Sequence, residues 1–435
     1  SCCRKPAAGM EVTSDSPRAV ASQKMVLELL LSDMPQERHT LNSELDEWAT
    51  KLKLGKPRFA KRHQPQADLS HFGIAVNLDS CIQCTRCVRA CREEQVNDVI
   101  GMAYRGHNAK VVFDFDKDMG QSTCVACGEC VQACPTGALM PSTMVDDNNV
   151  YLGKPDRTVD SVCPYCGVGC QLTYQIKDDK IVAVTGKNGP ANANRLCVKG
   201  RFGFDYVANP QRLTKPMIRK DGVPKVPHEF IDPSNPWTHF REATWEEALD
   251  RAAGGLKKIR DRDGSDALAG FGSAKGSNEE AYLFQKLVRT GFGTNNVDHC
   301  TRLCHASSVS ALLEGVGSAA VTATFNEVKN SELIIVIGAN PTENHPVAAT
   351  YFKQAAKRAA EAKSGVEVGY AIPKEGAQMF FDNLAIPKDA KNVAEAHELI
   401  NYLLRPEVAA KSTNYLGYAN GDTPDPKLIS KAVLD

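Results

Sequence analysis

The chain lacks features that would assign it to several common classes of protein. No run of about 20 apolar residues occurs, so the sequence predicts no membrane-spanning helix. Neither sign of charge is in excess, because 52 lysines and arginines balance 52 aspartates and glutamates. A neutral chain offers no electrostatic reason to bind nucleic acid or an anionic membrane surface, so neither partner is expected.

The first residues, SCCRKPAAGM, lack both an initiator methionine and the apolar core of a signal peptide. They are therefore expected to lie inside a longer polypeptide. Low-complexity sequence is also missing. The 435 residues and the hydrophobic fraction of 42% are sufficient for about three domains with ordinary apolar cores.

Cysteine, in contrast, is abundant, and most of the 16 cysteines fall into clusters. Secreted proteins that are rich in disulfides are usually short. The spacings in this chain are instead typical of iron ligands, and such thiolates need a reducing compartment. The sequence therefore predicts a cytoplasmic iron–sulfur protein.

Two runs share the spacing C-x2-C-x2-C-x3-C, and a proline follows the second. When two such runs hold two [4Fe-4S] clusters, three cysteines of each run bind one cluster and the fourth binds the other. The predicted ligands of one cluster are Cys81, Cys84, Cys87 and Cys134. Those of the other are Cys124, Cys127, Cys130 and Cys91. Two zinc knuckles are the alternative, but zinc sites usually separate two C-x2-C pairs by a longer loop.

A third set of cysteines has the spacing C-x2-C-x3-C-x26-C, which suits one further [4Fe-4S] cluster, with a structural zinc as the alternative. Its members are Cys163, Cys166, Cys170 and Cys197. The remaining cysteines have no such pattern. Cys2 and Cys3 lack partners nearby, and the segment HCTRLCHASS holds Cys300 and Cys304, the latter followed by His305.

The Cys304–His305 step can be interpreted in two ways. A soft thiolate suits a molybdenum or tungsten ion that dithiolenes already hold. An adjacent histidine can lower the pKa of a thiol and can move protons. From the spacing alone, however, a buried structural cysteine is the simpler interpretation, and it is the one that we expect for Cys300.

Periodicity and capping signals predict several elements. Ser16 and Pro17 indicate the start of a helix that ends near residue 32, and the aperiodic segment 55–71 is expected to be a linker. Thr244 and Glu247 form the pattern of a capping box that opens another helix. The run ELIIVIG, residues 332–338, predicts a short buried strand, and the helical pattern that follows it indicates a Rossmann-like layer.

The motifs CPYCGVGCQL and CVKGRFGFDYV, with the two ferredoxin-like runs and HCTRLCH, resemble a known family. Residues 1 to about 355 resemble the catalytic α subunit of cytoplasmic, NAD-dependent formate dehydrogenases that contain molybdenum or tungsten. The resemblance implies oxidation of formate to CO2, or the reverse reduction, at a metal bound by two molybdopterin guanine dinucleotides. It also implies electron transfer through three [4Fe-4S] clusters to two partners, a flavin-containing NADH-oxidoreductase subunit and a small [2Fe-2S] subunit.

The resemblance also gives roles to single residues. Cys304 matches the metal ligand, His305 the histidine that assists C–H cleavage, and Lys199 a lysine between a cluster and a pterin. A [2Fe-2S] cluster, completed by residues upstream of the chain, would use Cys2. Four residues match a loop that binds the nucleotide end of a pterin, namely Gly338, Asn340, Glu343 and Asn344.

The C-terminal segment, about 364–435, resembles a different family. Its motifs IPKEGA, DNLAIPKDAKN and NYLLRPEVA are similar to the C-terminal lobe of periplasmic polyamine-binding proteins. There Phe380 and Asp382 would correspond to residues that grip the polyamine, since an aromatic face and a carboxylate suit a diammonium ligand. Local packing is the alternative role of both residues. The chain is therefore expected to be a composite of two families.

The predicted fold is a multidomain α+β and α/β structure. A bis-[4Fe-4S] ferredoxin-like domain is followed by a [4Fe-4S] domain and by the start of a Rossmann-like molybdopterin oxidoreductase domain. The expected segments are 1–35, the end of a [2Fe-2S] ferredoxin-like domain; 36–74, a linker; 75–150, the two-cluster ferredoxin domain; 156–215, the [4Fe-4S] domain; 216–358, a partial pterin-binding α/β domain; and 359–435, the fragment that resembles a polyamine-binding protein.

Three alternatives to a formate dehydrogenase are open at this point. One is a non-catalytic iron–sulfur subunit like that of NADH dehydrogenase, which would have no need of the Cys304–His305 step. Another is a nitrate reductase-type molybdoenzyme, which the paired ferredoxin runs disfavour. A solute-binding protein is supported by the C-terminal segment alone.

Overall fold

The computed structural model describes residues 5–35, 43–226, 231–232, 235–321, 323–362, 386 and 393–416. Cys2, Cys3, Phe380 and Asp382 lie outside these residues, so the predictions made for them remain predictions. The chain divides into two compact units, Ser1–Val366 and Glu367–Asp435, and each is described by itself. None of the helices in the described part combines the length and the apolarity that crossing a bilayer requires.

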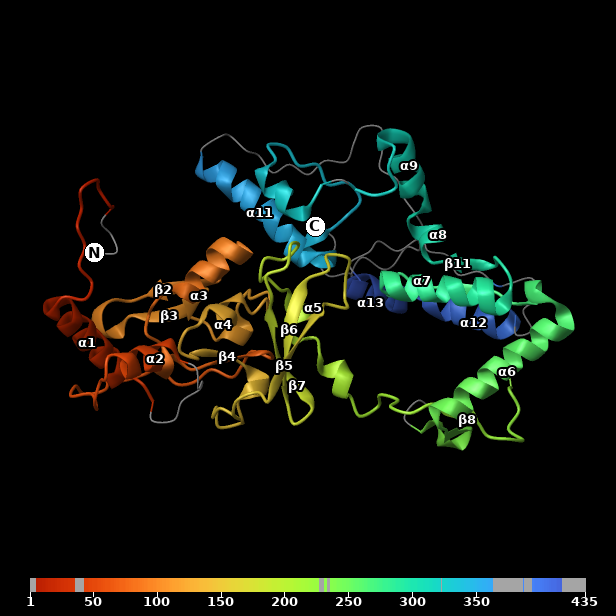
Figure 1. The fold of residues 1–435 in the computed structure, drawn as a ribbon, viewed down its shortest axis with the longest axis horizontal. Coiled ribbons are helices and arrows are strands. Elements are labelled where there is room, and N and C mark those ends of the chain that lie inside the picture. The colour runs from red at the N-terminus through yellow and green to blue at the C-terminus, as the bar shows by residue number, and fades with distance from the viewer. Residues whose placement is uncertain are drawn as a thin grey trace. The chain divides into compact units, whose positions relative to one another are not determined.

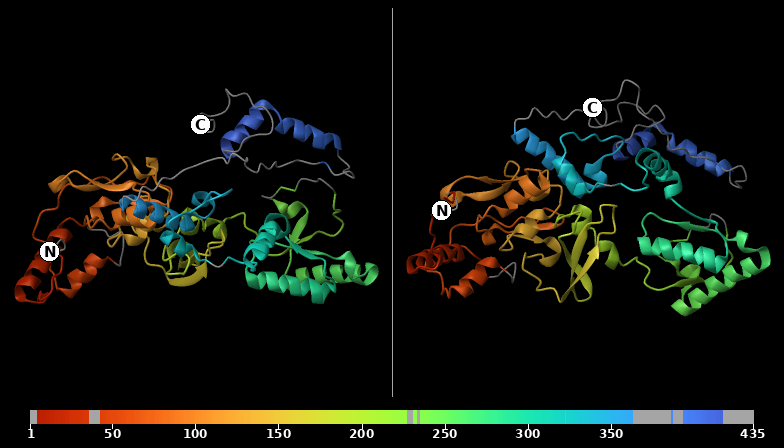
Figure 2. Two further views of the ribbon diagram at one scale, coloured as in Figure 1. Left: turned by 90° about the horizontal axis from the view of Figure 1, so that it is seen from above. Right: turned by 45° about the horizontal axis from the view of Figure 1, so that its top comes forward.

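The first two helices are α1 (Pro17–Ser32) and α2 (Glu44–Lys51), which pack together (Figure 2). The predicted start of α1 is confirmed, because Ala19 N–H donates to the Ser16 hydroxyl over 3.2 Å and Pro17 occupies the first turn. Helix α2 lies inside the stretch 36–74, where only a linker was expected. The buried side chain of Leu45 anchors this helix. Eight residues are too few to show a clear helical periodicity in the sequence, so the helix was not predicted.

The predicted linker, residues 55–71, contains no helix and only one β-bridge, between Asp68 and Val76. It is nevertheless held against α1 by charged side chains. Arg58 donates two hydrogen bonds to the Glu28 carboxylate, over 2.7 and 2.8 Å. The backbone N–H of Arg62 donates to Asp33 over 3.0 Å. This segment therefore follows a defined path between α1 and the cysteine-rich domain.

The cysteine-rich domain is built from two short antiparallel sheets, β1–β4 and β2–β3, and from short helices that begin within each cysteine run. Its buried core includes Ile74, Ile100 and Phe113 together with Cys91 and Cys130. The elements are β1 (Ile74–Val76), η1 (Leu78–Ser80), α3 (Arg86–Arg89), the π-helical turn η2 (Ala90–Gln95), β2 (Ile100–Ala103), η3 (Gly106–Asn108), β3 (Lys110–Phe113), η4 (Met119–Gln121), α4 (Glu129–Ala133), β4 (Leu139–Pro141) and η5 (Ser142–Met144).

A three-stranded antiparallel sheet in the order β5-β6-β7 follows, drawn in yellow in Figure 1. Its elements are β5 (Arg157–Val162), β6 (Gln171–Lys177), β7 (Lys180–Gly186), α5 (Val198–Phe202) and η6 (Asp205–Ala208). Helix α11 (Pro346–Glu361) comes much later in the sequence but packs on this part, because Val347 and Ala348 share a core with Leu172 and Val184. The helix predicted after residue 338 is thus confirmed, and it covers the third set of cysteines.

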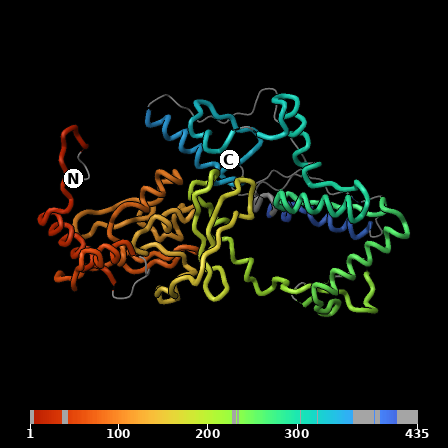
Figure 3. The backbone as a smooth tube through the Cα atoms, viewed as in Figure 1, coloured from red at the N-terminus to blue at the C-terminus, as the bar shows by residue number. Residues whose placement is uncertain are grey.

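The intervening residues hold mixed helix and strand, reached through residues 209–216, which run without helix or strand (Figure 3). Strands β10 and β11 pair in parallel with α7 between them, which is a βαβ arrangement. Glycine is required at position 270 of β10, because a Cβ there would collide with the side chain of Val288, in the π-helical turn that follows α7. The elements are β8 (Met217–Arg219), η7 (Pro236–Thr238), β9 (Phe240–Glu242), α6 (Trp245–Asp263), η8 (Ser265–Ala267), β10 (Gly270–Gly272), α7 (Asn278–Lys286), η9 (Leu287–Phe292), β11 (Val297–His299), α8 (Thr301–Cys304), α9 (Ala306–Val316), η10 (Phe325–Asn330) and α10 (Pro341–Asn344).

Two predictions for this part are wrong in detail. Residues 332–338 form no strand and are not buried, since Leu333 is 77% and Ile337 87% exposed. A parallel strand becomes buried only where neighbouring strands and helices cover it, and the described residues provide no such cover here. Helix α6 starts after Thr244 as expected, but the capping box is only half formed: Glu247 N–H donates to Thr244, while the Glu247 carboxylate pairs with Arg241.

The second unit contains two described helices, α12 (Val393–Leu403) and α13 (Pro406–Leu416). They contact each other across a short turn that ends at Pro406, a residue that favours the first turn of a helix.

Candidate iron–sulfur and metal centres

The two ferredoxin-like runs fold into loops of matching shape. Gln83 and Ala126 occupy the same position in each run and have left-handed backbones, with φ of 55° and 53°. Thr85 and Gly128 also correspond, with φ of 61° and 70°. L-residues other than glycine seldom adopt this conformation, so the surrounding structure must hold it in place.

In each of these loops a backbone N–H points at a thiol. Gln83 N–H donates to Cys81 Sγ, and Ala126 N–H donates to Cys124 Sγ, both over 3.4 Å. Such contacts favour the thiolate over the thiol and tune a metal–sulfur centre bound there.

Four thiols from both runs line the first thiol cavity, a small apolar cavity bounded also by Leu78, Val111 and Leu139. These thiols belong to Cys81, Cys84, Cys87 and Cys134. Cys84 is exposed, whereas Cys81, Cys87 and Cys134 are half-buried. The structure therefore brings together the four residues that spacing predicts for one cluster, with Cys134 supplied by the second run.

The second thiol cavity repeats this arrangement, with the fourth thiol supplied by the first run. Its four thiols are those of Cys91, Cys124, Cys127 and Cys130. Val99 and Ile100 complete the wall, and three of the four cysteines are buried. The exchange of the fourth cysteine between the two runs is thus present in the structure.

The third thiol cavity lies against β6, α5 and α11, and its four thiols are those of Cys163, Cys166, Cys170 and Cys197. Two of these residues are joined through the backbone, because Cys163 N–H donates to Cys170 O over 2.8 Å. Lys199, Asn344 and Val347 also line the cavity. The sequence placed Lys199 and Asn344 near a pterin, and the structure brings both to the third set of cysteines.

Burial, and in several cases the neighbouring thiols, raise the pKa of seven of these twelve thiols: Cys81, Cys87, Cys124, Cys127, Cys130, Cys163 and Cys170. Burial, and next the neighbouring thiols, raise the pKa of Cys170 to about 12. Burial likewise raises the pKa of Cys87 and of Cys127 to about 12, and that of Cys81 to about 11. Groups of thiols that resist ionisation in the free chain become thiolates when they bind metal, so binding releases protons.

The donor sets fit iron–sulfur clusters. A [4Fe-4S] cluster takes four cysteine thiolates, and each of the three cavities is lined by four cysteines and otherwise mainly by apolar groups. Within the described residues, no three His, Cys, Asp or Glu side chains converge closely enough to hold a single metal ion.

Cys304 ends the short helix α8, and His305 follows it; both side chains are exposed. The chemistry of a thiolate beside an imidazole fits a soft metal, but the described residues do not enclose this pair. Cys300 is also exposed, so the prediction of a buried structural cysteine is wrong for it, and its Sγ accepts a hydrogen bond from Ala274 N–H over 3.2 Å. The neighbouring Lys275 donates to the backbone oxygen of Tyr165, a residue that lines the third thiol cavity.

The predicted pterin loop leads into α10. Gly338 has φ of +64°, and the Asn340 amide donates to the Glu343 carboxylate over 3.4 Å. All four residues of the loop are exposed, and Asn344 also lines the third thiol cavity. The structure therefore brings one residue of this loop to the same cavity as Lys199.

Four charged residues that the sequence did not single out lie between the second and third cavities. Arg201 is 2% exposed and pairs with the buried Glu129, and Arg195 pairs with Glu94. Their only signal in the sequence is that Glu129 precedes Cys130 and that Arg195 and Arg201 flank Cys197. Charged residues beside ligands are common on surfaces as well, so position alone could not identify them.

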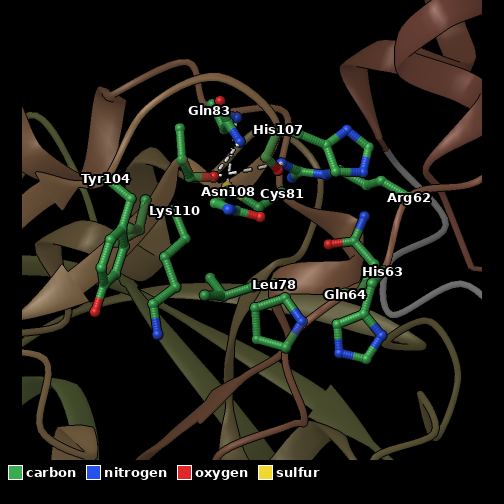
Figure 4. Close-up of a pocket in the computed structure, with 13 residues that line it drawn as sticks. Arg62, His63, Gln64, Leu78, Cys81, Gln83, Tyr104, His107, Asn108 and Lys110 are labelled. Carbon is green, nitrogen blue, oxygen red and sulfur yellow. Dashed lines mark hydrogen bonds between the residues drawn. The ribbon is translucent and has the colours of Figure 1, made fainter.

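A more open cavity of about 400 Å³ adjoins the first thiol cavity (Figure 4). Arg62 and Lys110 line it, and the Arg62 guanidinium donates to the backbone oxygens of His107 and Ala109. Cys81 lines both cavities. Cys81 is therefore part of the wall between the first thiol cavity and this more open cavity.

Three family models match consecutive parts of the chain. Residues 80–138 match the 4Fe-4S dicluster domain, residues 156–209 match the molybdopterin oxidoreductase Fe4S4 domain, and residues 212–408 match molybdopterin oxidoreductase. The first two matches contain all twelve cysteines of the three thiol cavities. The third extends into the segment that resembles polyamine-binding proteins, a resemblance that remains a prediction.

Curated relatives agree with these matches. The chain is 31% identical over 399 residues to a protein of Staphylococcus haemolyticus that is named as a putative formate dehydrogenase. This alignment covers 80% of this chain and 38% of the relative. It is 32% identical over 351 residues to a Bacillus subtilis protein whose name proposes an oxidoreductase, which covers 72% and 34%. A Staphylococcus aureus protein, also named for formate dehydrogenase, is 33% identical over 64% of this chain and 30% of its own length. The chain thus spans about a third of the length of these relatives.

Among solved structures, an NAD+-reducing [NiFe]-hydrogenase in the H2-reduced state aligns with 32% of this chain and 62% of its own, at 21% identity and a TM-score of 0.30.

Proposed function

We propose that this chain, which carries the iron–sulfur and pterin-binding segments of the molybdopterin oxidoreductases, is part of the catalytic subunit of a formate dehydrogenase, whose electrons pass through iron–sulfur clusters. The observation that supports this most strongly is the set of three cavities, each lined by four cysteines. Three [4Fe-4S] clusters would occupy them, bound by the twelve cysteines named above.

The chain's own groups are suited to such clusters. Backbone N–H groups of Gln83 and Ala126 point at ligand sulfurs, which favours the reduced, more negative state of a cluster. Lys199 places a cation at the edge of the third thiol cavity, where it would have the same effect. Val347 and Pro346 close that cavity with apolar surface, which limits the access of water.

The substrate assignment depends on Cys304 and His305. When bound, a molybdenum or tungsten pterin centre would supply the two-electron chemistry of formate oxidation. In this proposal Cys304 is a ligand of that metal, and His305 accepts or donates a proton beside the substrate. Gly338, Asn340, Glu343 and Asn344 would bind the nucleotide end of a pterin, with the glycine turn and helix start suited to phosphate. A flavin-bearing NADH-oxidoreductase subunit and a small [2Fe-2S] subunit would be the partners.

A second candidate is a non-catalytic electron-transfer subunit. It is favoured by the exposure of Cys304 and His305, because a metal that holds substrate is normally enclosed by protein. The three thiol cavities serve this function equally well, so the two candidates differ at Cys304 and not at the clusters.

Anaerobic reduction separates the candidates. The purified chain is titrated first with formate and then with dithionite, while the visible absorbance of the clusters and the molybdenum and tungsten content are measured. A formate dehydrogenase is bleached by formate and contains one of the two metals. Bleaching by dithionite alone, in a chain without either metal, would identify the electron-transfer subunit and reject catalysis by this chain.

A further inference from the structure

Two ion pairs connect the second thiol cavity to the third. The first joins the Arg201 guanidinium to Glu129 over 2.9 Å, and the second joins Arg195 to Glu94 over 2.6 Å. Both arginines lie within four residues of Cys197, a ligand of the third cavity, and both glutamates lie within three residues of a ligand of the second. Each of the two cysteine runs that form the second cavity is thus tied to the same short segment, residues 195–201, which contains Cys197 and most of helix α5.

The Arg201 side chain makes the more extensive connection. Besides Glu129, its guanidinium donates to the backbone oxygen of Cys127 over 3.1 Å and to the Gln132 side chain over 2.7 Å. It also reaches the backbone oxygen of Val184, on strand β7, over 3.1 Å. Nearly all of its hydrogen-bonding capacity is satisfied inside the protein, which a lysine with its single nitrogen could not reproduce.

The loop of the second cavity is shaped to receive this arginine. A Cβ at position 128 would lie 2.7 Å from both Cγ and Nε of Arg201, so glycine is required there by space as well as by its φ of +70°. Thr85, with φ of 61°, occupies the corresponding position of the first run. The two otherwise similar loops therefore differ where Arg201 crosses one of them.

Glu129 completes the connection from the opposite side. The oxygen that accepts from Arg201 also accepts from Leu196 N–H over 2.9 Å, and Leu196 immediately precedes Cys197. Burial raises the pKa of Glu129, and the Arg201 cation opposes this shift. A carboxylate and a guanidinium that are both buried hold fixed positions, because either one alone would be a costly uncompensated charge.

We propose that Glu129 and Arg201 are positioning residues that fix the separation of the second and third thiol cavities, and so set the electronic contact between the clusters that these cavities hold. The inference rests on the proposed function for the presence of clusters. Under this proposal, electrons pass between the dicluster domain and the third cavity through the cluster of the second cavity, and not directly from the cluster of the first.

Two measurements on the full chain, purified without oxygen, test this inference. The variant Arg201→Lys keeps the charge but loses the planar guanidinium with its several donors. In it, hydrogen exchange at the backbone amides of Leu196 and of position 201 should accelerate by about tenfold or more. Electron paramagnetic resonance of the fully reduced protein should lose the magnetic splitting between clusters, while iron content stays unchanged. Unchanged exchange together with unchanged splitting would overturn the proposal.

A milder variant and a control accompany this one. Gln132→Met removes one partner of Arg201 and keeps the buried ion pair, so it should show the same two changes to a smaller extent even if Arg201→Lys fails to fold. Arg89→Gln breaks the exposed pair with Glu93 in the same domain and should change neither measurement. A chain that binds no iron would reject the proposed function, whereas the exchange comparison would still decide on Glu129 and Arg201.

Discussion

The Nη2 atom of Arg201 lies 2.9 Å from Oε1 of Glu129, and both side chains are buried between two groups of cysteines. This contact spans 72 residues of sequence and joins the dicluster domain to the domain of the third cavity. It links the two cysteine-rich segments through a buried ion pair.

The exchange of fourth cysteines gives the first prediction. Cys134→Ala should remove the cluster of the first thiol cavity, although Cys134 belongs to the second run, and iron should fall by about four per chain. Cys91→Ala should remove the other cluster of the dicluster domain instead. Iron analysis and electron paramagnetic resonance distinguish the two losses, and Cys300→Ala, outside all three cavities, is the control. The crossed ligand sets would be contradicted if Cys134→Ala removed the cluster of the second cavity, or if Cys91→Ala removed that of the first.

The matched loops give a prediction for stability. Thr85→Gly should relieve the left-handed backbone of a β-branched residue and slow the loss of clusters in denaturant, by about 1 kcal/mol of stabilisation. Gly128→Ala should accelerate that loss for two reasons. The added Cβ would collide with Arg201, and alanine disfavours the positive φ at this position. The measured quantity is the rate of absorbance decay at fixed denaturant concentration. Equal rates for both variants would show that the loops are not held as described.

Histidine 71 gives a prediction for pH. His71 is buried, and its Nδ1 accepts a hydrogen bond from Gly73 N–H over 3.1 Å, which only the neutral ring can do. Burial lowers its pKa, and Asp68 opposes the shift. Because the folded-state pKa lies below the unfolded value of about 6.5, the stabilisation is complete above pH 6.5 and is lost as the pH falls toward the folded-state pKa.

The stability of the chain should therefore decline as the pH falls below about 6.5 toward the folded-state pKa, with a slope of at most about 1.4 kcal/mol per pH unit from this residue. His71→Asn keeps an acceptor but cannot titrate, so it should flatten this part of the profile. His63→Asn, which changes an exposed histidine, is the matched control. Denaturant unfolding at a series of pH values measures the difference, and identical profiles for wild type and His71→Asn would exclude the assignment.

The proposed metal ligand is tested by substitution. Cys304→Ala should abolish bleaching of the clusters by formate, while dithionite still reduces them and iron content is unchanged. Cys300→Ala should retain the response to formate, because the Cys300 thiol already accepts a hydrogen bond from Ala274. A Cys304→Ala protein that formate reduces as fast as wild type would show that Cys304 is not the ligand.

Local sequence was informative where chemistry depends on spacing. The three groups of four cysteines could be predicted because cluster ligands repeat at fixed intervals, and the structure gathers each group around one cavity. The helices after Ser16 and Thr244 could be predicted because caps are local signals. In contrast, residues 332–338 have the composition of a buried strand, but whether such a run is covered depends on neighbours that composition does not encode.

The contact between Glu129 and Arg201 was beyond prediction for a related reason. Nothing in the two local sequences indicates that a helix start in one domain meets a helix in another, and an isolated charged residue is ordinarily placed at the surface. Only the folded chain shows that Gly128 leaves space for the arginine. Long-range polar contacts of this kind require the tertiary structure.

The central claim is that the twelve cysteines of the three thiol cavities bind three [4Fe-4S] clusters. The most direct test is iron, zinc and acid-labile sulfide analysis of the full chain purified without oxygen, with Mössbauer spectroscopy of the iron. The account predicts about twelve irons and twelve sulfides per chain, all in [4Fe-4S] clusters, and almost no zinc. About three zinc ions per chain, with neither iron nor sulfide, would contradict it.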